Sequence, residues 1–337
     1  MKQVDNPPNP WSSTHVEWLG EPPEAELCVY EEQARSILTK NNSPDIPFCF
    51  GVNPYRGCYH GCAYCYARPT HQYLDFGAGT DFERKIIVKT NAADLLLRAF
   101  EKPGWEREPV AFSGITDCYQ PLEASYGITR KCLEVCAKIG NPVAIVTKGS
   151  LIRRDVDVLE RLNEEAGVHV YVSIPFADDE FGWAVEPHAS AISQRFRTIQ
   201  ILSEAGITTG VAIAPIIPGL NDSDVPTILE RAAELGATRA FMTLLRLPAE
   251  VLPVFEGRIR QVMPDRADKI LNTVRDVRQG KLNESQFGGR MVGKGPRWKI
   301  ISKLFETQCK RLGLNARQGA GVATELEKRG PLQQRLF

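Results

Sequence analysis

The segment RGCYHGCAYCYAR (56–68) brings three cysteines close together in the chain. Cys58, Cys62 and Cys65 have the spacing C-x3-C-x2-C. Three is an odd number for a disulfide framework and one ligand short of a closed tetrahedral metal site. An iron–sulfur cluster with four irons that is held by only three thiolates keeps one iron open for a further ligand. The spacing therefore favours a [4Fe–4S] cluster whose open iron takes part in chemistry.

Two other interpretations of these cysteines stay open at this point. A zinc ion could be completed by His60 or by His71, the latter giving the spacing C-x3-C-x2-C-x5-H. Alternatively, the three thiols could be buried structural groups. Tyr64 stands directly before the third cysteine, and the motif follows the first expected strand, and both features favour the cluster.

Short apolar runs rich in β-branched residues alternate with segments of helical period, as is typical of parallel βαβ units covered on both faces of a sheet. The runs are FCFGVNPY (48–55), PVAFSGIT (109–116), NPVAIVTK (141–148), VHVYVSI (168–174), TTGVAIAPI (208–216) and RAFMTLLRL (239–247). The pattern predicts an α/β fold, either an open (β/α)6 barrel or a doubly wound sheet.

Residues able to bind or react gather immediately after these runs. Arg56 and the cysteines follow the first run, and Thr116, Asp117 and Cys118 follow the second. The later runs end in Lys148, Ser173, Pro215 and Arg246. Because ligands bind at the carboxyl ends of parallel strands in both architectures, these residues are expected to meet at one edge of the sheet.

Composition and charge narrow the class of protein. The chain has 337 residues, with 41 Lys and Arg against 41 Asp and Glu, so no net charge attracts it to nucleic acid or to a membrane surface. No segment approaches the ~18 consecutive apolar residues of a membrane span, and the Pro-rich N-terminus has no apolar run of signal-peptide length. We expect a cytoplasmic protein without a membrane partner, whose nine cysteines are thiols or metal ligands.

The cysteine motif with Tyr64 resembles the signature of the radical S-adenosylmethionine (radical SAM) superfamily. Further segments are similar to a bacterial group related to spore photoproduct lyase and often described as DNA-repair-photolyase-like: TDCYQPLE (116–123), VTKGSLIRRD (146–155) and APIIPGLND (214–222). The resemblance implies a partial (β/α)6 TIM-like barrel that binds a [4Fe–4S] cluster and S-adenosylmethionine (SAM). It implies reductive cleavage of SAM to a 5′-deoxyadenosyl radical, which abstracts hydrogen from a substrate.

The resemblance also implies roles for particular residues. Cys58, Cys62 and Cys65 would hold the cluster. The implied SAM-binding residues are Tyr64, Thr116, Asp117, Lys148, Ser173, Arg195 and Ala214. Lys148 matches a contact to the SAM carboxylate, Ser173 one near the ribose, and Ala214 a wall against the adenine. Asp117 could instead be a helix N-cap, and Arg195 could simply pair with Glu186 on the surface.

The chain departs from spore photoproduct lyase at the residue that returns hydrogen to the product. The lyase resembles this chain at the second strand but has a cysteine where this chain has Gly114. Cys118 is the nearest thiol that could act in its place, and Tyr119 is a weaker catalytic candidate, as a relay. A small buried cysteine is commonly a packed apolar group, which is the alternative for Cys118.

The remaining predictions concern the ends of the chain and its partners. We expect an N-terminal extension (1–47) wrapping a core (48–250), followed by a helical segment (251–337). Residues 281–317 hold nine Lys or Arg and two acidic residues, and Phe287, Trp298 and Phe305 are interleaved with them, which suits contacts to nucleic acid. Nucleic acid is therefore the expected substrate, with a small molecule or a peptide as the alternative. A reductant of flavodoxin or ferredoxin type is the expected electron donor, and a non-enzymatic cluster-binding or zinc-binding protein is the competing class.

Overall fold

The computed structural model describes residues 26–316. Its centre is a seven-stranded sheet with the strand order β10-β9-β8-β7-β6-β3-β2. The parallel strands coincide with the six predicted runs: β3 (Phe50–Val52), β6 (Val110–Phe112), β7 (Val143–Thr147), β8 (Val168–Ser173), β9 (Thr208–Ile216) and β10 (Arg239–Leu244). The edge strand β2 (Leu38–Lys40) pairs antiparallel with β3.

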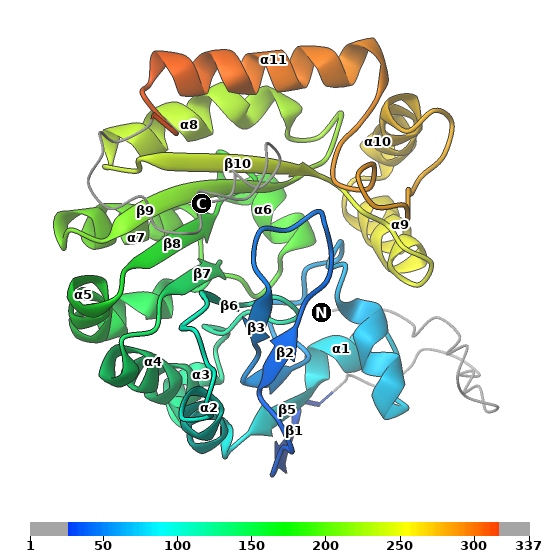
Figure 1. The fold of residues 1–337 in the computed structure, drawn as a ribbon. Coiled ribbons are helices and arrows are strands. Elements are labelled where there is room, and N and C mark those ends of the chain that lie inside the picture. The colour runs from blue at the N-terminus through cyan, green and yellow to red at the C-terminus, as the bar shows by residue number, and fades with distance from the viewer. Residues whose placement is uncertain (1–25, 317–337) are drawn as a thin grey trace.

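Helices cover the outer face of this sheet. They are α2 (Ala92–Phe100), α4 (Ile128–Ile139), α5 (Val156–Glu165), α7 (Ile192–Glu204) and α8 (Val225–Glu234). Each helix buries its apolar stripe against the strands, as Ile228, Leu229 and Ala232 do on α8. Figure 1 shows the strands curving around a centre with these helices outside. The predicted α/β fold with a partial (β/α)6 barrel is confirmed.

A second, three-stranded sheet supports the cysteine segment. It has the order β1-β5-β4 and consists of β1 (Cys28–Glu32), β5 (Lys85–Lys89) and β4 (Tyr55–Arg56). The short helix α1 (Thr80–Arg84) and a 3-10 helix (Arg68–Leu74) lie between β4 and β5. The described part of the predicted N-terminal extension thus adds strands to both sheets, through β1 and β2. Residues 1–25 lie outside the described residues.

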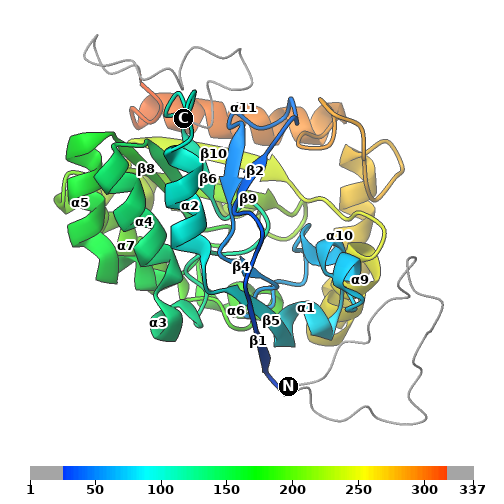
Figure 2. The same cartoon turned by 60° about the horizontal axis from the view of Figure 1, so that its bottom comes forward.

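The described chain after β10 is helical, as predicted. It contains α9 (Val251–Val262), α10 (Pro264–Val277) and α11 (Gly295–Arg311), and α11 packs along α8. Figure 2 shows α9 and α10 on the opposite side of the molecule from α4 and α5.

The remaining short elements are α3 (Glu123–Tyr126), α6 (Asp179–Val185) and 3-10 helices at Ser150–Asp155 and Asp222–Asp224. None of the helices within residues 26–316 has the length and apolarity needed to cross a membrane.

Candidate active site

The cysteine loop is folded by its own backbone and by its glycines. Cys58 N donates to Phe82 O at 2.9 Å, and Cys65 N donates to Cys62 O at 3.2 Å. Gly57 has a φ of +77°, and a Cβ there would lie 2.9 Å from Phe82 O. Only glycine fits such a close approach in this conformation, so the turn before the first cysteine depends on it.

Arg68 holds the other end of this loop, a role that the sequence analysis missed. Its side chain is 0 % exposed, and its guanidinium donates to four backbone carbonyls. Two of them, Gly61 and Cys62, belong to the loop, at 3.2 and 2.9 Å, and the other two are Ala78 and Gly79. An ion pair with Glu83 completes the set. The loop is therefore attached to the segment that leads into α1.

The three thiols suit a cluster better than a single zinc ion. All three are unpaired and line one cavity. His71 packs its ring on Phe76 and Phe82, with Nε2 2.8 Å from Lys85 O. His60 lies beside Cys58, and its Nδ1 is 3.4 Å from Asp117. Among residues 26–316, no three His, Cys, Asp or Glu side chains are arranged around one ion position. In a cluster each thiolate has its own iron, so three separated thiols are sufficient.

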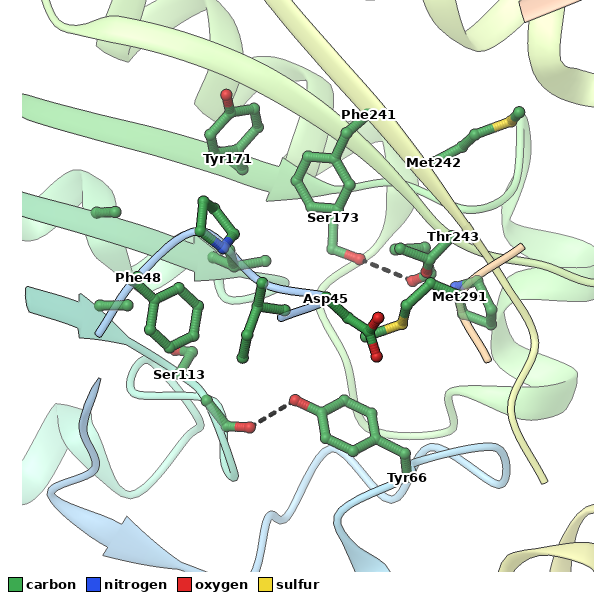
Figure 3. A pocket seen from close by; sticks show the side chains of 18 of the residues that line it. Asp45, Phe48, Tyr66, Ser113, Tyr171, Ser173, Phe241, Met242, Thr243 and Met291 are labelled. Carbon is green, nitrogen blue, oxygen red and sulfur yellow. Dashed lines mark hydrogen bonds between the residues drawn. The ribbon is translucent and has the colours of Figure 1, made fainter. Parts of the chain in front are cut away.

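The cavity has a volume of about 1360 Å³ and extends from the cysteine loop across the carboxyl ends of the strands to α11. Aromatic rings from several elements line it: Phe48, Tyr64, Tyr66, Phe112, Tyr171, Phe241, Phe287, Trp298 and Phe305. Figure 3 shows Phe48, Tyr66, Tyr171 and Phe241 around the same space as Ser173. An apolar cavity with a few convergent polar groups is the usual form of a small-molecule site.

Thr116 and Asp117 both line the cavity and also organise its wall. The Thr116 hydroxyl donates to Gly57 O at 2.7 Å, which fixes the turn before Cys58. Asp117 accepts from the Thr147 hydroxyl at 2.6 Å and from Lys148 N at 2.7 Å. Burial acts to raise the pKa of Asp117, but His60 and these donors lower it to about 2. Asp117 is not a helix N-cap, because α3 begins at Glu123.

A buried polar network joins Lys148, Ser173, Glu186 and Arg195 to the cysteine loop. Lys148 Nζ donates to Ser173 Oγ at 2.8 Å and lies 3.7 Å from Glu186. Arg195 pairs with Glu186 at 2.5 Å and donates to Ser173 O at 3.1 Å, and both charged side chains are buried. The Tyr64 hydroxyl donates to Glu186. The surface salt bridge considered for Arg195 is therefore a buried ion pair.

Of the remaining predicted site residues, one lines the cavity and two lie in the core. Ala214 lines the cavity, and its carbonyl accepts a hydrogen bond from Ser173 Oγ at 3.3 Å. Cys118 and Tyr119 are buried in the core and are not among the residues that line the cavity. The Tyr119 hydroxyl lies 3.2 Å from Asp155. Tyr66, which the sequence analysis did not single out, lines the cavity and donates to Gly114 O at 2.5 Å.

The basic segment 281–317 is less available as a surface than its composition indicates. Arg290 pairs with Asp45, Arg297 with Asp276, and Arg311 with Glu230. Trp298 and Phe305 are each only 7 % exposed, and they line the cavity. Residue 317 of this segment lies outside the described residues. Trp298 and Phe305 thus contribute to the cavity, whereas Phe287 also lines it but stays 60 % exposed beside Arg290.

Comparison with known proteins extends this description. The family model for the Radical SAM superfamily matches residues 52–232. An uncharacterized protein of Mycobacterium tuberculosis is 39% identical over 215 residues, which is 63% of this chain and 63% of that protein. A Radical SAM Nalpha-GlyT isomerase of Pseudomonas phage M6 is 26% identical over 214 residues, 62% of this chain and 42% of that protein. The matches thus span less than two thirds of these relatives.

Among solved structures, a spore photoproduct lyase complexed with dinucleoside spore photoproduct has a similar fold. The TM-score is 0.63, with 16% sequence identity, and the match covers 90% of this chain and 88% of that one. At this identity the likeness establishes a shared fold.

Proposed function

This chain belongs to the radical SAM superfamily, and from that premise we propose that its cavity is the active site of an enzyme that abstracts hydrogen from a substrate. The cofactors of the superfamily are a [4Fe–4S] cluster and SAM. When bound, they supply a 5′-deoxyadenosyl radical, formed with methionine when one electron from a flavodoxin-type or ferredoxin-type reductant cleaves SAM. The chain's own residues bind the two cofactors, orient them and exclude water.

The observation that carries the proposal is the position of the three thiols. Cys58, Cys62 and Cys65 are unpaired, and they line one end of a cavity whose wall also carries Lys148 and Ser173. In this proposal the three cysteines hold the cluster, and one iron remains open for the amino acid portion of SAM.

The proposed SAM contacts come from the strand ends that line the same cavity. Lys148 binds the carboxylate and Ser173 the ribose, with Tyr64, Thr116, Asp117 and Ala214 beside them. Arg195 acts as a positioning residue, because its guanidinium is occupied by Glu186 and by the backbone of Ser173 and Ser190. The buried pair keeps Lys148 and Ser173 in place before the cofactor arrives.

We propose a nucleic-acid component as the substrate, in a photoproduct-lyase-like reaction. The aromatic lining supports this, since such rings can stack on an extruded base. The similar lyase is complexed with a dinucleoside spore photoproduct, which points the same way. Cys118 stays a prediction as the hydrogen donor and Tyr119 as a relay, and each would act through a residue that lines the cavity.

The test is formation of 5′-deoxyadenosine under anaerobic conditions. Wild type, Cys62→Ala and Cys28→Ala proteins are reconstituted with iron and sulfide, reduced with dithionite and mixed with SAM. Cys28 is exposed on β1 and serves as the matched cysteine control. We expect product from wild type and Cys28→Ala and none from Cys62→Ala. Absence of product from wild type with an intact cluster would reject the proposal.

A further inference from the structure

Arg246 lines the cavity without a partner for its charge. It follows β10 at the carboxyl end of the sheet, and its Nε is buried without a hydrogen-bond partner. Within residues 26–316 the side chain makes only a contact with the Tyr66 ring, 5.2 Å from the guanidinium carbon. Arg246 as a whole is half-buried, and a partly desolvated guanidinium that makes no ion pair at a cavity suits an anion.

The backbone on both sides of Arg246 is held in place. Leu244 N donates to Met291 O at 3.0 Å and Leu245 N to Ile216 O at 2.9 Å. Leu247 N donates to the Asn283 side chain at 3.1 Å. The guanidinium is therefore presented from a fixed backbone, which reduces the entropy cost of binding an anion there.

The charges around Arg246 leave an excess of cations. Arg278 lies behind it and donates to Leu245 O at 2.7 Å and to Arg290 O at 3.0 Å. Arg290 lines the cavity too, but it pairs with Asp45, whose other oxygen accepts from Gly288 N at 2.6 Å. Burial and the neighbouring Arg290 lower the pKa of Arg246. Asp45 is thus fully engaged by Arg290 and Gly288, and Glu284 interacts with Arg278, so three guanidiniums face two carboxylates and neither carboxylate forms an ion pair with Arg246.

The aromatic residues near Arg246 indicate what kind of molecule the anion belongs to. Tyr66 lies under Arg246 and directly follows Cys65, while the Phe287 ring lies 4.4 Å from the Arg290 guanidinium carbon. Planar rings beside cations suit a base and its phosphate together. An arginine fork can bind two phosphate oxygens at once.

We propose that Arg246 binds the phosphate of a nucleotide-type substrate and thereby places the attached sugar and base beside the cysteine loop. This inference rests on the proposed function, because it assigns part of the same cavity to the substrate. It differs from binding of nucleic acid to the surface lysines and arginines of 281–317, since the phosphate would enter the cavity.

Binding of thymidine 5′-monophosphate and of thymidine to reconstituted full-length protein tests the proposal. The two affinities are measured by calorimetry at two salt concentrations for wild type, Arg246→Gln, Arg246→Lys and Arg297→Gln. Arg297 is the matched control, because it is an exposed arginine on α11 that pairs with Asp276 and does not line the cavity. The ratio of the two dissociation constants isolates the phosphate contribution.

We expect wild type and Arg297→Gln to bind the nucleotide about 10- to 100-fold more tightly than the nucleoside, as one charge-assisted contact would give. Arg246→Gln should lose this preference and its salt dependence. Arg246→Lys should keep part of it, because lysine retains the charge without the fork. An unchanged preference in Arg246→Gln, a loss confined to Arg297→Gln, or no phosphate preference in wild type would overturn the proposal.

The two proposals can fail separately. If wild type forms 5′-deoxyadenosine but shows no phosphate preference that depends on Arg246, the anion site is wrong and the radical chemistry stands. If the preference is present but wild type with an intact cluster does not cleave SAM, the anion site stands and the proposed activity is wrong.

Discussion

Replacing Arg68 by glutamine should release the cysteine loop. The Arg68 guanidinium donates hydrogen bonds to the carbonyls of Gly61, Cys62, Ala78 and Gly79. A glutamine amide has only two N–H donors. At least two buried carbonyls then lose their donor, at about 1–3 kcal/mol each. We therefore expect Arg68→Gln to lower the free energy of unfolding by about 2–6 kcal/mol.

Two measurements follow this change. Urea unfolding of the cluster-free protein gives the loss of stability, and iron content after anaerobic reconstitution reports whether the loop still binds a cluster. Arg98→Gln is the control, because Arg98 is exposed on α2. If Arg68→Gln fails to fold, Arg68→Lys is measured, which should show a smaller loss of both quantities. Unchanged stability and iron content in both Arg68 variants would refute the anchoring role.

Three further predictions address other parts of the structure. Lys148→Met should weaken SAM binding to the reconstituted protein by about 10- to 100-fold in equilibrium dialysis. Lys138→Met is the control, because Lys138 is exposed, and it should leave the affinity unchanged. Equal affinities of the two variants would remove Lys148 from the SAM site. Asp45→Asn should break the ion pair with Arg290 and speed hydrogen exchange in 41–48 and 286–291, and unchanged exchange would contradict this. Burial, then Arg56, lowers the pKa of Lys89 from 10.5 to about 8. Between about pH 8 and pH 10.5, Lys89 therefore binds more protons in the unfolded chain than in the folded one. The contribution of Lys89 to the free energy of unfolding consequently rises with pH in that range. Relative to Lys89→Met, wild type should gain about 3 kcal/mol on going from about pH 7 to about pH 11 in denaturant unfolding, and a constant difference would refute the burial argument.

The sequence predicted the strands best, because a strand buried on both faces needs a continuous apolar run. All six predicted runs contain a parallel strand, and β9 has the bounds of its run, 208–216. The second sheet was not predicted. Its strands β1 and β4 have five and two residues, and they form only because β5 lies between them. Such short strands depend on long-range pairing more than on their own composition.

For the site, the cysteine spacing and the strand ends located the cavity, but they did not reveal how it is supported. Arg68 binds backbone carbonyls, which every residue has, so no partner residue type marks the interaction in the sequence. Trp298 and Phe305 were interpreted as surface aromatics beside cations, yet α11 turns them toward the cavity as it packs along α8. Which face of a helix is buried follows from its tertiary partner, which a local pattern of mixed charge and aromatics does not specify.

The contact between Asp45 and Arg290 joins residues 245 positions apart, at the edge of the cavity. During synthesis the ribosome completes the cysteine loop long before it reaches Arg290. At typical elongation rates the delay is on the order of 10–45 s. During that interval, the part of the cavity wall that α11 and the loop before it provide is absent, and the three thiols are not covered by it. A cluster inserted early would stand open to oxygen, so the order of chain completion and cofactor insertion matters for this fold.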